Sequence, residues 1–197
     1  MTKRVFAVVL ALFFCGTAGA DLYVNISTTS GGGWPYSPYI ITPNAEPDVP
    51  VWMPAQFDTF CVEMNQTFSP GKYRATIDND ILYGGDGLAD LLSDDVKKIY
   101  AAYLNGALSG IDGNVVQRSV WGAQGYTWYS DPAINAAITD TGAIAGWNDV
   151  KVLNLWGGDA YTGVDRQSQL VMTPVPGAVL LGMIGLGLAG VKFRRFA

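Results

Sequence analysis

The segment FDTFCVEM, Phe57 to Met64, is rich in aromatic and β-branched residues and predicts a β-strand. It contains Cys61, one of two cysteines in the 197-residue chain. The other, Cys15, lies in a stretch with the pattern of an export signal, so Cys61 would be the sole cysteine of the exported chain. Outside the cytoplasm a single thiol oxidises, pairs with another chain or serves some other chemistry.

The two ends of the chain carry membrane signals. Residues 1–20 have a basic start, a short apolar core and a small-residue AGA end, which predicts a signal peptide and a mature chain beginning at Asp21. Residues 175–191 are uncharged and are followed by the basic residues Lys192, Arg194 and Arg195. This pattern predicts a short transmembrane helix with a cytoplasmic basic end and places residues 21–173 outside the membrane. A buried C-terminal core helix is the alternative.

The charge of the external part limits its partners. Five of the 12 basic residues lie in the two end segments, so residues 21–173 carry seven basic and 17 acidic side chains and a net charge of −10. Such an acidic surface argues against nucleic acid or anionic lipid as a partner. These 153 residues are enough for one domain with a substantial core.

The external part reads as strands, then helices, then strands. A helix is predicted at 93–110 with Ser93 as its cap, a second starting near Asn114, and a third at 131–139 with Asp131 as cap and Pro132 in the first turn. The Gly- and Pro-rich residues 29–54 predict an irregular loop or collar. The predicted strands are 21–28, 56–64, 72–78, 149–157 and 166–172.

This order predicts an α+β domain with an antiparallel β-sheet or sandwich and an inserted helical segment. The chain contains no histidine, which excludes a Ser-His-Asp triad, a Cys-His protease site and zinc sites built on imidazole. We therefore predict no catalytic residues, no cofactor, no enzymatic turnover and, apart from the calcium alternative given below, no metal site.

Two short motifs resemble those of the thioester domains of bacterial surface adhesins. These domains carry an aromatic-Cys-aliphatic-acidic segment on a strand and, downstream, an aliphatic-Gln-x-x-aliphatic-Trp segment on a helix. The matching segments are FCVE, from Phe60 to Glu63, and VQRSVW, from Val116 to Trp121. The resemblance spans Phe57 to Met172 and implies an internal thioester between Cys61 and Gln117, with Glu63, Val120 and Trp121 as motif positions around it.

Thioester chemistry explains these residue types. A thiolate adds to the side-chain carbonyl of Gln117 and ammonia leaves, which gives an acyl group open to attack by an amine. The bond survives only where water is excluded, and the aromatic residues near the predicted helix are candidates for shielding it. These residues are Trp121, Tyr126, Trp128 and Tyr129.

Other roles for the same residues remain open. Cys61 on an apolar strand is equally consistent with an inert buried thiol, and an odd cysteine in an exported chain also permits an intermolecular disulfide. Gln117 lies three residues after Asn114, which is close to a capping-box arrangement, and Trp121 fits as a core residue.

Two further groups are candidates for binding. Asp78, Asp80, Asp86 and Asp90 could supply oxygen ligands to calcium, although their spacing differs from that of an EF-hand loop and suits solvated loop acids. Aromatic residues of the Gly- and Pro-rich segment could stack on sugar rings or pack against the sheet. These residues are Trp34, Tyr36, Tyr39 and Trp52.

The last 24 residues resemble the PEP-CTERM sorting signal of Gram-negative bacteria that produce exopolysaccharide. The matching features are Pro174, Pro176, the apolar GAVLLGMIGLGLAG stretch and the basic end with Arg194 and Arg195. Val175 stands where the family has glutamate. The resemblance implies handling by an exosortase-type enzyme, with possible release after processing.

The sequence therefore predicts an exported bacterial cell-surface protein with a single-pass anchor at 174–197 and an external domain at 21–173. Its partners would be the membrane, a surface protein amine or exopolysaccharide, and the processing enzyme. Two functions remain: covalent attachment through Cys61 and Gln117, or a noncovalent structural or polysaccharide-binding role in the extracellular matrix with a buried free thiol.

Overall fold

The computed structural model describes residues 22–28, 37–44, 49–67, 69–82, 90–157 and 164–173. The predicted signal peptide and the predicted membrane helix with its sorting motif lie outside these residues. Within the described ranges, no helix combines the length and the apolar character that crossing a membrane requires.

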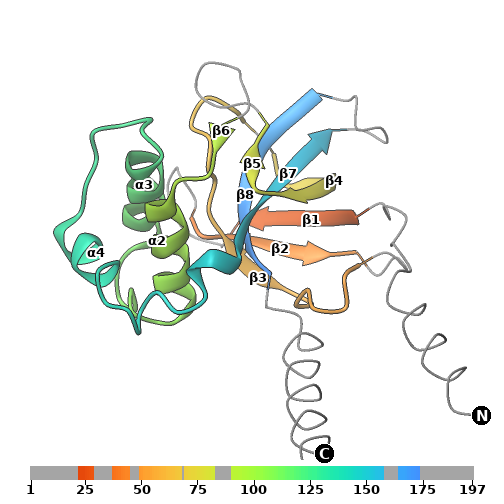
Figure 1. Cartoon of the computed structure of the whole chain (residues 1–197). Coiled ribbons are helices and arrows are strands. Elements are labelled where there is room, and N and C mark those ends of the chain that lie inside the picture. The colour runs from red at the N-terminus through yellow and green to blue at the C-terminus, as the bar shows by residue number, and fades with distance from the viewer. Residues whose placement is uncertain are drawn as a thin grey trace, which may run out of the picture.

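The domain has a mixed α+β fold whose main sheet is antiparallel (Figure 1). Six strands are hydrogen-bonded in the order β3-β2-β1-β4-β7-β8, and a two-stranded pair β5-β6 stands beside them. The strands of the sheet are β1 (Leu22–Thr28), β2 (Tyr39–Pro43), β3 (Phe57–Thr59), β4 (Gly71–Asp78), β7 (Val150–Gly157) and β8 (Val164–Met172). The small pair consists of β5 (Asp80–Ile81) and β6 (Asp90–Leu91).

The six-stranded sheet closes on itself where the chain leaves β3. The Leu170 amide donates to the Phe60 carbonyl at 3.2 Å, and the Val62 amide donates to the Ser168 carbonyl at 2.9 Å. Between these two bonds, Cys61 faces Gln169 in an antiparallel bridge. The two end strands of the sheet therefore meet, and Cys61 lies at their junction.

Closure produces two apolar cores. One face of the sheet packs on itself through a cluster that includes Val24, Ile41, Cys61 and Leu155. The other face packs against the helices through a cluster that includes Phe60, Val62, Val152 and Leu170, together with apolar residues of the helices. The alternation along residues 60–62 sends Cys61 into the first core and its two neighbours into the second.

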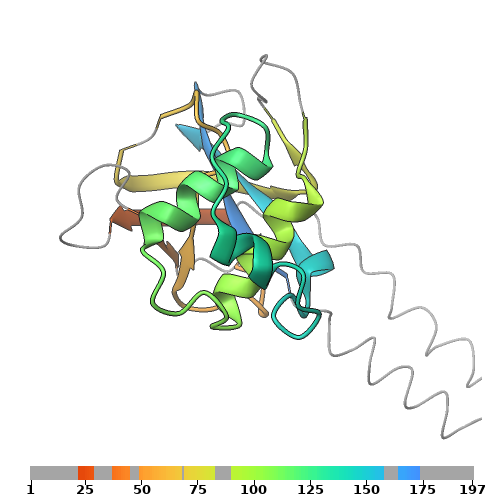
Figure 2. The ribbon, with the colours of Figure 1, turned by 90° about the vertical axis from the view of Figure 1, so that its left-hand side faces the viewer.

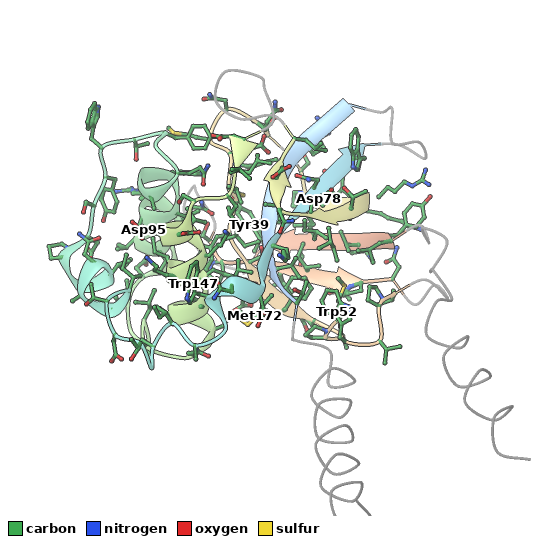
Figure 3. All side chains as sticks on the ribbon, viewed as in Figure 1. Tyr39, Trp52, Asp78, Asp95, Trp147 and Met172 are labelled. Atoms are coloured by element: carbon green, nitrogen blue, oxygen red, sulfur yellow. The ribbon has the colours of Figure 1, made fainter. Side chains whose placement is uncertain are left out.

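The helices form one layer against that second core (Figure 2). They are α2 (Asp94–Leu104), α3 (Gly113–Ala123) and α4 (Pro132–Ala137), followed by a short 3-10 turn at Trp147–Asp149. Figure 3 places Asp95 and Trp147 in this helical half, while Asp78 and Trp52 lie in the sheet half. Side-chain caps start the helices: Ser93 accepts from Val96 N, Asp112 from Asn114 N, and Asp131 from Ala133 N and Ile134 N.

The sequence-based prediction of an irregular segment at 29–54 is wrong for β2. Residues 39–43 pair with β1 on one side and β3 on the other, so their backbone groups are satisfied by the sheet despite nearby prolines. The first helix also ends earlier than predicted: it stops at Leu104, where Gly106, with φ of +79°, turns the chain.

We expect Thr59→Val to weaken the closure of the sheet. Thr59 is fully buried, donates from its hydroxyl to Leu170 O at 2.7 Å and accepts from Leu170 N at 3.0 Å. Removing the hydroxyl while keeping the shape should lower the free energy of unfolding by about 1–3 kcal/mol. Urea denaturation measures the change.

Thr76→Val on β4 is the matched control, because Thr76 is only partly buried in the same sheet. We expect it to change stability by no more than about 0.5 kcal/mol. Equal midpoints for the two variants would show that Thr59 does not stabilise the junction.

Candidate functional site

Helix α3 carries Gln117 to the junction of the sheet. Val116 and Val120 are fully buried in the core between the helices and the sheet, and Trp121 reaches the core inside the sheet. Gln117 is also fully buried, although it is a long polar side chain. Since buried polar groups need partners, its contacts define the site.

The side-chain amide of Gln117 binds the backbone of Cys61 at both ends. Gln117 Oε1 accepts from Cys61 N at 2.8 Å, and Gln117 Nε2 donates to Cys61 O at 2.7 Å. Gln117 Oε1 accepts a second bond from the Ser37 hydroxyl at 3.1 Å. The two predicted thioester residues, 56 positions apart, are thus in direct contact, and the carbonyl of Gln117 faces two donors.

Strand register explains the position of this amide. Strands β2 and β3 pair with Tyr39 opposite Thr59, Ile40 opposite Asp58 and Ile41 opposite Phe57. Continuing this register would set Ser37 opposite Cys61. Gln117 inserts between these two residues and takes the hydrogen bonds that a strand neighbour would otherwise give to Cys61. The glutamine amide therefore replaces a peptide group at the end of the β2-β3 ladder.

Close packing holds Ser37 against the start of α3. A Cβ added at Gly113 would lie 2.1 Å from Ser37 O and 2.7 Å from Pro38 Cδ, so only glycine permits this approach. Asn114 Oδ1 accepts from Ser37 N at 3.2 Å. Asn114 therefore does not cap α3, a role that Asp112 fills, but fixes the serine that contacts Gln117.

The sulfur of Cys61 lies against a different glutamine. Gln169 Nε2 is 3.3 Å from Cys61 Sγ, and Sγ is 3.8 Å from Gln169 Oε1. Burial raises the pKa of the Cys61 thiol well above its ordinary range. Hydrogen bonds with Gln169 and Tyr39 lower this pKa, and the negative charge of Glu63 raises it further. Tyr39, labelled in Figure 3, lies on β2 and belongs to the same apolar cluster as Cys61. At neutral pH the buried sulfur is a neutral thiol.

Glu63 holds the same segment on β8. Its Oε2 accepts from Ser168 N at 2.7 Å, and its backbone carbonyl accepts from Gln167 Nε2. Glu63 and Gln169 are among the largest fully buried side chains of the described residues. The segment around Cys61 is therefore tied to β8 on one side and to Gln117 on the other.

The predicted shielding aromatics take different positions. Trp121 is 5% exposed and belongs to the same apolar cluster as Cys61, and Tyr126 packs against that cluster. Trp128 is fully exposed, in contrast to the sequence-based prediction, and covers neither Cys61 nor Gln117. Gly125, with φ of +92°, turns the chain after α3. Tyr129 lies under the Arg118 guanidinium instead, with 5.9 Å between the ring centroid and Cζ.

The sorting-motif and calcium candidates form a separate group of predicted residues. Pro174, Pro176, Arg194 and Arg195 lie outside the described residues, as does Asp86. Across the part of the chain that the structure describes, no three Asp, Glu or Cys side chains are grouped as a metal site would require. The calcium hypothesis for Asp78, Asp80 and Asp90 has no geometric support there.

Sequence reasoning missed Ser37 and Gln169. Ser37 lies in the stretch that was predicted to be irregular, and its link to Gln117 spans 80 residues. Gln169 is one of three consecutive uncharged polar residues, Gln167 to Gln169, in a predicted strand. That run of polar residues in a buried strand was the only available signal, and it does not identify the cysteine 108 residues away.

Comparison with known families and with curated proteins finds no match to this chain. The function is therefore argued from the site itself.

We expect Gly113→Ala to displace Ser37 from the site. The added methyl group would collide with backbone atoms of Ser37, so the strand end or the helix must move. The expected loss of stability is about 1–3 kcal/mol, measured as a lower midpoint in urea.

Gly142→Ala is the control, because its added Cβ would meet only the flexible Asp140 carboxylate at 3.3 Å. We expect this variant to stay within about 1 kcal/mol of the wild type. A wild-type midpoint for Gly113→Ala would contradict the close packing of Ser37 on α3.

Proposed function

We propose that this chain is a covalent attachment protein that uses an internal thioester between Cys61 and Gln117. The observation that carries the proposal is the position of the Gln117 amide, which contacts the backbone of Cys61 with its carbonyl oxygen bound by two donors. The alternative role of Gln117 as a capping residue has no support, because its side chain is directed at Cys61.

In the first step the thiolate of Cys61 attacks Cδ of Gln117. A C–S bond forms, the C–N bond breaks, and the NH₂ group leaves as ammonia with the proton that the thiol has lost. Negative charge develops on Oε1 during the attack. The Cys61 N–H and the Ser37 hydroxyl already bind this oxygen, at 2.8 Å and 3.1 Å, and so stabilise the charge as an oxyanion hole does.

The strand geometry suits this attack. The Gln117 amide is bound in the hydrogen-bonding plane of Cys61, while the side chain of a strand residue stands roughly perpendicular to that plane. The sulfur would therefore approach the amide carbon from above its plane, the side from which a nucleophile adds to a carbonyl. Rotation about the Cα–Cβ bond of Cys61 would carry the sulfur from Gln169 toward Gln117.

In the second step a primary amine of a partner attacks the thioester. The C–S bond breaks, an amide to Gln117 forms, and the thiolate takes up the proton that the amine releases. Cys61 is 1% exposed and Gln117 is fully buried, so water is excluded from the bond. Each chain reacts once, which makes the function attachment and not catalysis.

The sequence at the two ends places this chemistry at the cell surface in our proposal. The signal peptide exports the domain, and residues 174–197 anchor it or mark it for an exosortase-type enzyme. A lysine of a surface protein would be the amine. The thiol chemistry needs no metal or cofactor.

The mass of the folded chain tests the thioester. We expect the purified protein to be lighter than its sequence by one ammonia, because the C–S bond replaces a C–N bond. Methylamine should convert it to an adduct of the thioester form. Both effects should disappear in Cys61→Ala and Gln117→Ala. Fragmentation of the wild type in the mass spectrometer should show that Cys61 and Gln117 are cross-linked.

Gln124→Ala is the control, since Gln124 ends α3 and bonds Ser93 and Leu91 instead of Cys61. This variant should keep the ammonia loss. A folded wild type of unmodified mass with a shielded thiol would overturn the proposal in favour of a noncovalent matrix protein. A dimer that reductant separates would show an intermolecular disulfide.

Ser37→Ala should slow formation of the thioester. The variant keeps the Cys61 N–H but loses the second donor to Gln117 Oε1. A single donor of this kind is worth on the order of a hundredfold in rate. Refolding from denaturant, with samples taken for mass spectrometry, gives the rate of ammonia loss.

Ser119→Ala is a matched control on α3. Ser119 is also buried, but its hydroxyl donates to Val115 O within the helix. Its refolded chains should lose ammonia at the wild-type rate. Equal slowing in both variants would assign the Ser37 effect to general loss of stability.

A further inference from the structure

The sulfur of Cys61 has its own polar neighbour, which the proposed thioester does not consume. Gln169 is fully buried on β8 and faces Cys61 in the antiparallel bridge that closes the sheet. Its Nε2 is 3.3 Å from Sγ, within the range of a hydrogen bond to sulfur. No motif in the sequence indicated a role for this residue.

A second hydrogen bond fixes which end of the Gln169 amide faces the sulfur. Gln169 Nε2 donates to Gln167 O at 3.1 Å. An amide nitrogen has two hydrogens, and this bond uses one of them. The other is therefore available to the sulfur, so Gln169 is held as a donor to Cys61.

Such a donor meets a need that the burial of Cys61 creates. The thiolate is the nucleophile when the thioester forms and the leaving group when an amine opens it, yet burial disfavours that charge. The titratable groups that act on the sulfur are Glu63, whose charge opposes the thiolate, and Tyr39, which bonds it. Within the described residues, Gln169 contributes the larger of the two opposing hydrogen bonds.

We propose that Gln169 is a positioning residue that holds the Cys61 sulfur and stabilises its thiolate in both steps of the proposed attachment reaction. The inference rests on the proposed function for its biological meaning. Its physical content, a donor that favours the thiolate, applies to the free thiol as well. In the first step Gln169 stabilises the thiolate before the C–S bond forms. In the second step it stabilises the thiolate that is released when the C–S bond breaks.

The test measures alkylation of the free-thiol form of the full chain by iodoacetamide over a range of pH. Where the wild type carries the thioester, methylamine first releases the thiol, and where it does not, the untreated chain is used. Gln169→Met removes the donor at similar size. Gln169→Glu keeps the shape but faces the sulfur with a carboxylate, and Gln124→Met makes the same change as the first variant away from the site.

For each unit that the thiol pKa rises, the fraction of thiolate at a fixed pH below the pKa falls about tenfold, while the nucleophilicity of the thiolate rises about threefold. We therefore expect alkylation at fixed pH to slow by about threefold for each unit. Gln169→Met should show at least this slowing, Gln169→Glu a larger one, and Gln124→Met none. Methylamine should also open the thioester more slowly in both Gln169 variants. Looser packing alone would expose the buried thiol and speed its alkylation, so slowing distinguishes the proposed role from a structural one.

Rates equal to or faster than those of the wild type in the Gln169 variants would overturn the inference. Should Gln169→Met fail to fold, the shape-preserving Gln169→Glu decides, with the same expected direction. A wild type without ammonia loss would overturn the thioester. The alkylation rates of the free thiol would still decide whether Gln169 stabilises the thiolate.

Discussion

The structure depends on one side-chain amide that occupies the place of a backbone peptide group. Gln117 forms hydrogen bonds with the buried N–H and C=O of Cys61 where the β2-β3 ladder ends. The hydroxyl of Ser37 donates a further hydrogen bond to the side-chain carbonyl oxygen of Gln117. Without Gln117, two buried backbone groups would lose their partners, each at a cost of about 1–3 kcal/mol. The contact that joins α3 to the sheet is also the contact that our proposal turns into a covalent bond.

The two cores meet at this contact, which explains why a short segment carries so much of the site. Residues 60–62 alternate between the core inside the sheet and the core under the helices, so Cys61 faces inward while Phe60 and Val62 pack toward α2 and α3. Helix α3 makes the same division: Val120 lies in the helical core and Trp121 in the core inside the sheet. The site thus lies where helix and sheet are each fixed by their own apolar packing.

Local signals in the sequence were sufficient for most elements. The caps Ser93 and Asp131 and the alternation of β1 depend on neighbours a few positions away, so a single sequence reveals them. Cys61 and Gln117 were paired through two motifs and not through spacing. Ser37 and Gln169 escaped because their roles come from register: one lies beyond the end of β2, hidden among glycines and prolines, and the other enters only when β8 meets the end of β3. Trp128 was misplaced because composition does not show which way a turn directs its loop.

Closure of the sheet has a consequence for a chain folding among its own copies. An open end strand presents a row of unpaired N–H and C=O groups to which another chain can add, the usual start of aggregation. Here the residues after β3 form hydrogen bonds with the middle of β8. At this position the backbone groups of the two end strands therefore pair with each other and are not open to another chain. The polar run from Gln167 to Gln169, which would be a sticky template if exposed, is covered by the same contact.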